Sequence, residues 1–257
     1  MAQFDRPTIA ARAGSAAAID EGLRSYMLRV YNYMGLGLVV TGLVAYFTSA
    51  WATTTNSSEA VAQLANGVML TNAGVALYGS PLQWVVMLAP LAFVLVLSFG
   101  INKLSSGTAQ ILFWVFAAVM GLSLSSIFLV YTGASVAKVF FISAAMFGAM
   151  SLWGYTTKRD LTAMGSFLMM GLIGIIIASI ANFFFNSGAL AFGISIVGVL
   201  VFVGLTAYDT QRIKESYSES YGADVLTKNA VMGALSLYLD FINLFLMLLR
   251  LMGNNRS

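Results

Sequence analysis

The chain has 257 residues, of which 59% are hydrophobic and only 9% are charged, whereas soluble domains carry about 25% charged residues. So few charged side chains cannot cover the apolar surface of a soluble protein of this length. Cysteine and histidine are both absent, which excludes disulfides, thiol nucleophiles and the usual zinc or haem ligands. Any proton-sensitive behaviour must therefore come from carboxylates.

Apolar stretches of about 20 residues can cross a bilayer as helices, and seven stretches of the chain qualify. They cover residues 27–50, 82–101, 108–131, 134–155, 162–185, 189–211 and 228–252. We therefore predict an all-α membrane protein with seven transmembrane helices.

The longest predicted loop runs from Trp51 to Pro81. Residues 60–79 within it are mildly apolar but are interrupted by Gln63, Asn66 and Asn72. This segment could form a short interfacial helix, and an eighth span there is the main alternative to the count of seven.

The positions of Lys and Arg predict the orientation, because cytoplasmic loops of membrane proteins are enriched in these residues. Ten of the 13 basic residues precede the first span or lie in the even-numbered loops, and three lie on the other side. We therefore predict a multi-pass protein of the bacterial inner membrane, with the N-terminus in the cytoplasm and the C-terminus outside. The basic residues are scattered, so they indicate topology and not a nucleic-acid partner.

The predicted organisation has three parts: a flexible cytoplasmic tail of residues 1–26, a transmembrane domain of residues 27–252, and a C-terminal tail of residues 253–257. The first 26 residues lack the apolar core of a signal peptide. Small residues recur within the spans, which is typical of closely packed membrane helices. They include Gly35, Gly37, Gly42, Ala144, Gly148, Gly171, Gly174, Gly193, Gly198 and Gly204.

Asp240 lies about 11 residues inside the seventh span, about 17 Å from its start. An ionised carboxylate near the middle of the bilayer costs about 3 kcal/mol on insertion scales. We therefore favour a role for Asp240 in an ion or proton pathway, with Asn243 one turn further along the same face. The alternative is a neutral Asp that links helices by hydrogen bonds.

Asp209 lies at the cytoplasmic end of the sixth span, near Arg212. Its position alone is equally compatible with a functional role and with an ordinary ion pair at the membrane surface. A layout based on hydropathy places Asp209 and Asp240 about 15 Å apart in depth. For the two to meet, one of the last two spans must tilt or be shifted along its axis.

Motifs for nucleotide binding, metalloproteases and hydrolytic triads are absent from the sequence. An intramembrane aspartyl protease would also use two Asp residues on neighbouring spans. Tyr208-Asp209 fits the first half of that pattern, but Leu237-Tyr238-Leu239 replaces the Gly-x-Gly expected before Asp240. We therefore expect no enzymatic activity.

From about residue 24 onward, the chain resembles the bacterial branch of the Bax inhibitor-1 family. The most specific segments are Tyr208-Asp209-Thr210-Gln211 and Ser236 to Phe245 (SLYLDFINLF). The resemblance implies seven helices with the last one central, surrounded by the other six. It also implies a calcium-permeable leak channel or exchanger in which Asp209 and Asp240 form a hydrogen-bonded, pH-sensing pair.

Two carboxylates in a low-dielectric site share a proton and titrate together, and their oxygens suit transient Ca²⁺ binding. We therefore predict Asp209 and Asp240 as the pH-sensing, ion-path and Ca²⁺-contacting residues. The predicted supporting residues are Tyr208, Gln211, Arg212, Asn243 and Lys103. No cofactor is expected, and the expected partners are the lipid bilayer, Ca²⁺ and other membrane proteins.

The chain departs from the family at the cytoplasmic end of the second span. The resemblance implies an Arg there that engages the aspartate pair, as in the best-understood bacterial relative. Here only Lys103 is cationic, and an ammonium group cannot grip carboxylates with a bidentate fork. The alternative function is a non-transporting regulator or scaffold that modulates a membrane-bound protease or a stress response. In that alternative the aspartates only specify helix packing.

Overall fold

The computed structural model describes the backbone of residues 6–256 and the side chains of residues 21–256. The elements in chain order are α1 (Arg6–Ala52), β1 (Thr53–Thr54), β2 (Ala62–Gln63), β3 (Met69–Leu70), α2 (Asn72–Tyr78), α3 (Leu82–Gly100), α4 (Ser106–Leu124), α5 (Ile127–Val130), α6 (Gly133–Thr156), α7 (Thr162–Phe185), α8 (Gly188–Glu215) and α9 (Ala223–Met252).

Within the described residues, seven helical segments are long and apolar enough to cross a membrane. This agrees with the predicted fold class, and the boundaries of the second to fifth spans match the prediction within two residues. The last two spans are longer than predicted. Helix α9 begins at Ala223 and α8 continues to Glu215, because Arg212, Lys214 and Glu215 end the apolar run of α8 but are good helix formers.

Residues 60–79 form neither an eighth span nor a single interfacial helix. Strands β1, β2 and β3 form a small antiparallel sheet with β3 in the centre. Helix α2 follows, capped by the Thr71 side chain, which accepts a hydrogen bond from the Gly74 amide. Its seven residues extend only about 10 Å, far less than the hydrocarbon thickness.

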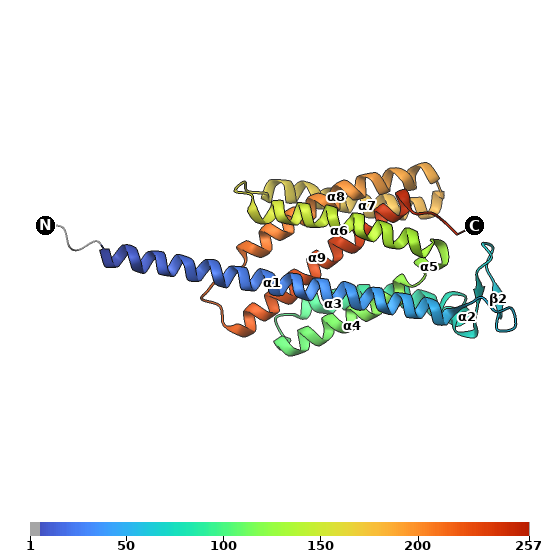
Figure 1. Ribbon diagram of the computed structural model, residues 1–257. Coiled ribbons are helices and arrows are strands. Elements are labelled where there is room, and N and C mark those ends of the chain that lie inside the picture. The colour runs from blue at the N-terminus through green and yellow to red at the C-terminus, as the bar shows by residue number, and fades with distance from the viewer. Residues whose placement is uncertain (1–5, 257) are drawn as a thin grey trace.

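Helix α9 is the central helix of the bundle (Figure 1). In its most apolar stretch 67% of the residues are buried, against 33% or fewer in every other span. Helices α1, α4, α6 and α8 pack directly on α9, whereas the main partner of α3 is α4 and that of α7 is α8. The six other spans therefore surround α9 in two groups, with α3 and α7 on the outside.

Helix α1 crosses residue 26, the predicted boundary between the tail and the transmembrane domain. The helix begins at Arg6 and continues without interruption to Ala52. At the other end of the chain, residues after α9 pair with the turn between α5 and α6. The Arg256 amide donates to the Val130 carbonyl at 2.8 Å, and the Thr132 amide donates to the Asn254 carbonyl at 3.1 Å.

The loops that carry basic residues gather at one end of the bundle. The α3–α4, α6–α7 and α8–α9 connections lie at the end from which the N-terminal part of α1 projects (Figure 1). The small sheet, the α7–α8 turn and the C-terminus lie at the opposite end. The distribution of Lys and Arg is therefore asymmetric in space as well as in sequence.

Small residues serve two different purposes in the spans. A side chain at Gly198 would meet Met247 at 2.8 Å, and one at Gly204 would meet Leu168 at 2.6 Å, so helices pack closely there. In contrast, Gly35, Gly148 and Gly174 have no atom of the protein within 4 Å of an added Cβ. The close packing expected for small residues thus applies to only part of the set.

Candidate functional site

Helices α8 and α9 form an antiparallel pair whose register is fixed by close contacts. A Cβ on Gly233 would lie 3.1 Å from the Ile213 side chain, and a Cβ on Gly198 would lie 2.8 Å from Met247. In this register the first two turns of α9 project beyond the end of α8. Asp240 therefore lies only about one helical turn, or about 5 Å, deeper than Asp209.

The carboxyl groups of Asp209 and Asp240 lie within hydrogen-bonding reach of each other. The predicted separation of about 15 Å in depth between Asp209 and Asp240 is therefore wrong. Helix α8 continues beyond Asp209, and the first turns of α9 extend beyond the end of α8, so Asp240 lies less deep relative to Asp209 than hydropathy suggested. Asp240 is only 6% exposed, and the Asp209 side chain is 16% exposed. Among the described residues, no hydrogen-bond donor faces Oδ2 of Asp240.

Arg212 is the cation that contacts the pair. Its Nη1 atom lies 3.8 Å from Oδ1 of Asp209, and its side chain is 67% exposed. A contact of this length at an exposed site contributes little stability. Arg212 is thus held only weakly by Asp209, with most of its side chain exposed.

A cavity of about 200 Å³ leads from the basic end of the bundle to Asp209. Its polar lining consists of Asp209, Arg212, Ser216, Asn229 and Ser236. Because Ser236 precedes Asp240 by one turn of α9, the cavity ends beside the pair. We call this cavity, together with the residues that line it, the vestibule.

Beyond Asp240, α9 is enclosed by apolar side chains. Leu244 is fully buried, and Phe241 and Leu249 are 2% and 1% exposed. The Phe241 ring packs edge-on against Phe140 and Phe147 of α6. The surroundings of α9 are therefore apolar on the side of the pair that faces away from the vestibule.

A buried hydrogen-bond chain fixes α9 to α1 and α4 near the pair. The Thr41 hydroxyl donates to the Ala117 carbonyl at 2.7 Å, so the Tyr238 hydroxyl donates to Thr41 at 2.6 Å. The Tyr238 ring also packs edge-on against Phe113 and Phe116. Helix α9 is thus anchored on the α1–α4 side, opposite the contact with α8.

Comparison with known proteins identifies the family of the chain. The family described as inhibitor of apoptosis-promoting Bax1 matches residues 23–257, which include both aspartates and all seven spans. The chain belongs to the Bax inhibitor-1 family. This finding bears out the resemblance seen in the sequence motifs.

Bacterial relatives match over nearly their whole length. The inner membrane protein YbhL of Escherichia coli K12 is 48% identical over 247 residues, covering 95% of this chain and 98% of YbhL. The uncharacterized protein RP147 of Rickettsia prowazekii is 48% identical over 238 residues, covering 93% of each chain. The YbhL relative and the seven apolar helices together support a multi-pass protein of the inner membrane.

The other predicted site residues divide into near and distant ones. Arg212 contacts Asp209, and Asn243 lies one turn beyond Asp240, where its amide bonds the Leu239 carbonyl at 2.8 Å. Tyr208 faces away toward α7 and packs on Gly165. Lys103 is exposed in the turn between α3 and α4, and α3 packs mainly on α4, so Lys103 does not join the pair.

Gln211 organises the α6–α7 loop. Its Oε1 accepts a hydrogen bond from the Leu161 amide, and its Nε2 donates to the Arg159 carbonyl, both at 2.8 Å. Within the segment Tyr208 to Gln211 (YDTQ), Asp209 therefore contacts α9, whereas Gln211 holds the α6–α7 loop by two hydrogen bonds.

Ser236 and Asn229, which line the vestibule, were not predicted from the sequence. Their signal is present but weak: residues 229, 233, 236, 240 and 243 recur at helical spacing along one face of α9. Serine and asparagine in a span also pack as ordinary polar links between helices. Only the cavity distinguishes them from such links.

Proposed function

We propose that the protein forms a pH-sensitive, passive path for Ca²⁺ across the inner membrane, gated by the Asp209–Asp240 pair. The observation that carries this proposal is the contact between two carboxyl groups at the end of a polar vestibule, in a helix that is otherwise closely packed. Burying a carboxyl pair between transmembrane helices costs free energy, so such a pair is a candidate functional site.

The chemistry of the pair provides the proton sensitivity. Two adjoining carboxylates with little access to water cannot both ionise cheaply, so they hold one proton between them and titrate as a unit. Oδ2 of Asp240 faces no donor among the described residues, which makes a second negative charge there more costly. A shared proton converts the contact into a hydrogen bond between α8 and α9.

Loss of this proton changes the forces between the two helices. Two negative charges then repel across the α8–α9 interface, or Asp209 turns toward the exposed Arg212. Because α9 packs on four other spans, a shift of α9 relative to α8 also alters the apolar closure around Phe241. This coupling links the protonation state to the opening of the path.

The vestibule suits a hard cation that binds weakly. It offers oxygen atoms from Asp209, Ser216, Asn229 and Ser236, and Ca²⁺ prefers six to eight oxygen ligands. No group of three or more acidic residues that could hold a metal occurs within residues 21–256. Weak contact is appropriate for conduction, because an ion must leave the site as readily as it enters.

Ion flux through the purified protein tests this function. Liposomes that contain the protein and a Ca²⁺ indicator should take up Ca²⁺ faster than protein-free liposomes, and uptake should change with pH. The double variant Asp209→Asn/Asp240→Asn should lose the pH-dependent part of the uptake. The control variant Asp160→Asn should retain it, because Asp160 lies exposed in the α6–α7 loop.

Absence of Ca²⁺ uptake at every pH, from protein that is correctly folded, would contradict the proposal. It would favour a non-transporting regulator. Uptake that persists with unchanged pH dependence in the double variant would instead show a Ca²⁺ path that does not use the pair.

A further inference from the structure

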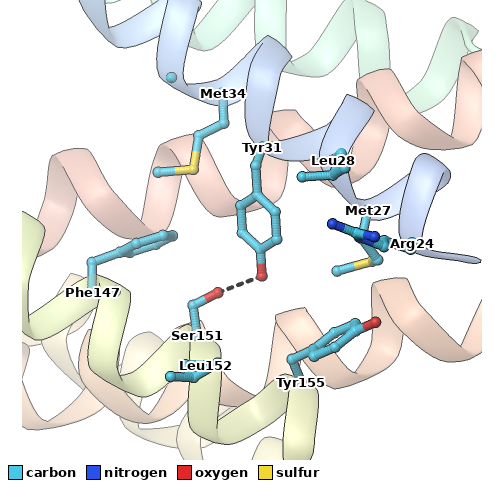
Figure 2. Close-up of a pocket in the computed structure, with 11 residues that line it drawn as sticks. Arg24, Met27, Leu28, Tyr31, Met34, Phe147, Ser151, Leu152 and Tyr155 are labelled. Atoms are coloured by element: carbon cyan, nitrogen blue, oxygen red, sulfur yellow. Dashed lines mark hydrogen bonds between the residues drawn. The ribbon is translucent and has the colours of Figure 1, made fainter.

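Helices α1 and α6 lie side by side across a cleft that opens at the membrane-facing surface of the bundle. Helix α1 packs mainly on α4 and α9, and α6 packs mainly on α8 and α9. The α1–α6 cleft has a volume of about 590 Å³. Figure 2 shows its walls, which include Met27, Met34, Phe147 and Leu152.

Two glycines keep this cleft open. Gly35 of α1 and Gly148 of α6 both line it, and neither has a protein atom within 4 Å of an added Cβ. Their lack of side chains therefore does not serve close helix packing. It leaves space that something other than this chain can fill.

The cleft is apolar at one end and cationic at the other. Arg24 and Tyr155 lie at one end, and Met34 and Phe147 lie at the other (Figure 2). Lys214 lies 5.2 Å from the centroid of the Tyr155 ring and donates to the Tyr155 carbonyl at 2.8 Å. Arg24 lines this end of the cleft, and Lys214 adds a second positive charge beside Tyr155, next to the residues of the lining.

The wall between these ends carries one polar feature. The Tyr31 hydroxyl bonds Ser151 at 2.6 Å (Figure 2), and Ser151 bonds Thr210 of α8 at 2.9 Å. These hydroxyls satisfy one another, so an apolar chain can lie against them without leaving a buried polar group unpaired. Thr210 follows Asp209 in sequence, which connects the cleft to the helix that carries the pair.

We propose that the α1–α6 cleft is a binding site for an anionic phospholipid, with one acyl chain in the cleft and the phosphate at Arg24 and Lys214. From Arg24 to Gly35 the cleft runs about 17 Å along α1, which matches the depth of one leaflet, about 15 Å. Charge complementarity favours an anionic headgroup over a zwitterionic one, because basic residues near the membrane surface attract anionic lipids. We call Arg24 and Lys214 the rim of the cleft.

The test uses native mass spectrometry of the full-length protein in detergent, titrated with phosphatidylglycerol or with phosphatidylcholine. The wild-type protein should bind one phosphatidylglycerol molecule more tightly than any other lipid. Gly148→Leu fills the cleft and should weaken this binding about tenfold, as expected when a few methylene groups are displaced. Gly174→Leu is the matched control, since Gly174 is equally free of neighbours but lies on α7.

The rim is tested separately by Arg24→Gln and Lys214→Gln. Each variant should reduce phosphatidylglycerol binding about fivefold and leave phosphatidylcholine binding unchanged. Circular dichroism and thermal unfolding verify that each variant is folded. Phosphatidylglycerol binding that is the same in wild type, Gly148→Leu and Gly174→Leu would overturn the site, and equal binding of the two lipids by the wild type would overturn the role of the rim.

Discussion

Asp209 on α8 and Asp240 on α9 bring their carboxyl groups within hydrogen-bonding reach across an antiparallel helix pair. The contact lies where the vestibule ends and the apolar closure of α9 begins. In the proposed function, the proton shared by the pair lies between this polar cavity and the apolar core. This location is the reason for proposing the pair as the control point of a Ca²⁺ path.

The anchor between α1 and α9 should depend unequally on its two residues. Tyr238→Phe removes one hydrogen bond but leaves Thr41 bonded to the Ala117 carbonyl, so we expect a loss of about 1 kcal/mol in the free energy of unfolding. Thr41→Val also leaves the buried Tyr238 hydroxyl unpaired, and we expect about 2 kcal/mol. Denaturant unfolding in micelles measures both, and the reverse order would contradict the assigned donors.

The Gln211 amide should hold the α6–α7 loop in place. Gln211→Leu removes both of its hydrogen bonds and leaves the Leu161 amide without its acceptor, which should cost about 2–3 kcal/mol. Trypsin should then cleave faster after Lys158 and Arg159. Gln211→Glu keeps the acceptor and should be cleaved at an intermediate rate, whereas equal cleavage of all three proteins would show that Gln211 does not restrain the loop.

Gly154 and Gly174 should respond in opposite ways to the same substitution. A Cβ on Gly154 would strike the backbone of Ala207, lying 2.8 Å from its Cα atom. Gly154→Ala should therefore destabilise the protein by about 1–3 kcal/mol. Gly174→Ala meets no neighbour and should be neutral or slightly stabilising because alanine favours helices. Thermal unfolding of the two variants measures the difference.

The orientation can be tested with single cysteines, because the natural sequence contains none. The basic loops predict that the N-terminal end of the bundle faces the cytoplasm. A membrane-impermeant maleimide should label Ser57→Cys, near the small sheet, in intact cells. It should label Ser220→Cys, in the α8–α9 connection, only after the membrane is permeabilised, and the opposite pattern would reverse the topology.

The sequence predicts the spans well because each spanning helix must by itself be long and apolar enough to cross the hydrocarbon core. It predicts less well where α8 ends and where α9 begins. At the end of α8, Arg212, Lys214 and Glu215 lower the hydropathy while remaining helical. The sheet after α1 escapes prediction because its two-residue strands are too short to show alternation.

The candidate site is predictable in part. Asp240 is recognisable from its position in an apolar span and Asp209 from the motif around it. Their contact depends on the offset between two helices, which hydropathy does not encode. The α1–α6 cleft is likewise invisible in the sequence, because it is the space left where α1 and α6 both pack on α9.

The central claim is that protonation of the Asp209–Asp240 pair controls Ca²⁺ movement. The most direct test measures initial Ca²⁺ uptake into proteoliposomes from pH 5 to pH 9 for wild type, Asp240→Asn and the control Asp160→Asn. Hydrogen bonds from Thr162 lower the pKa of Asp160, so Asp160 stays ionised over this range. Uptake should vary with pH for wild type and Asp160→Asn and be constant for Asp240→Asn, because the amide does not titrate and Asp209 then has no second carboxyl group with which to share a proton. A pH profile for Asp240→Asn that matches the wild type would contradict the claim.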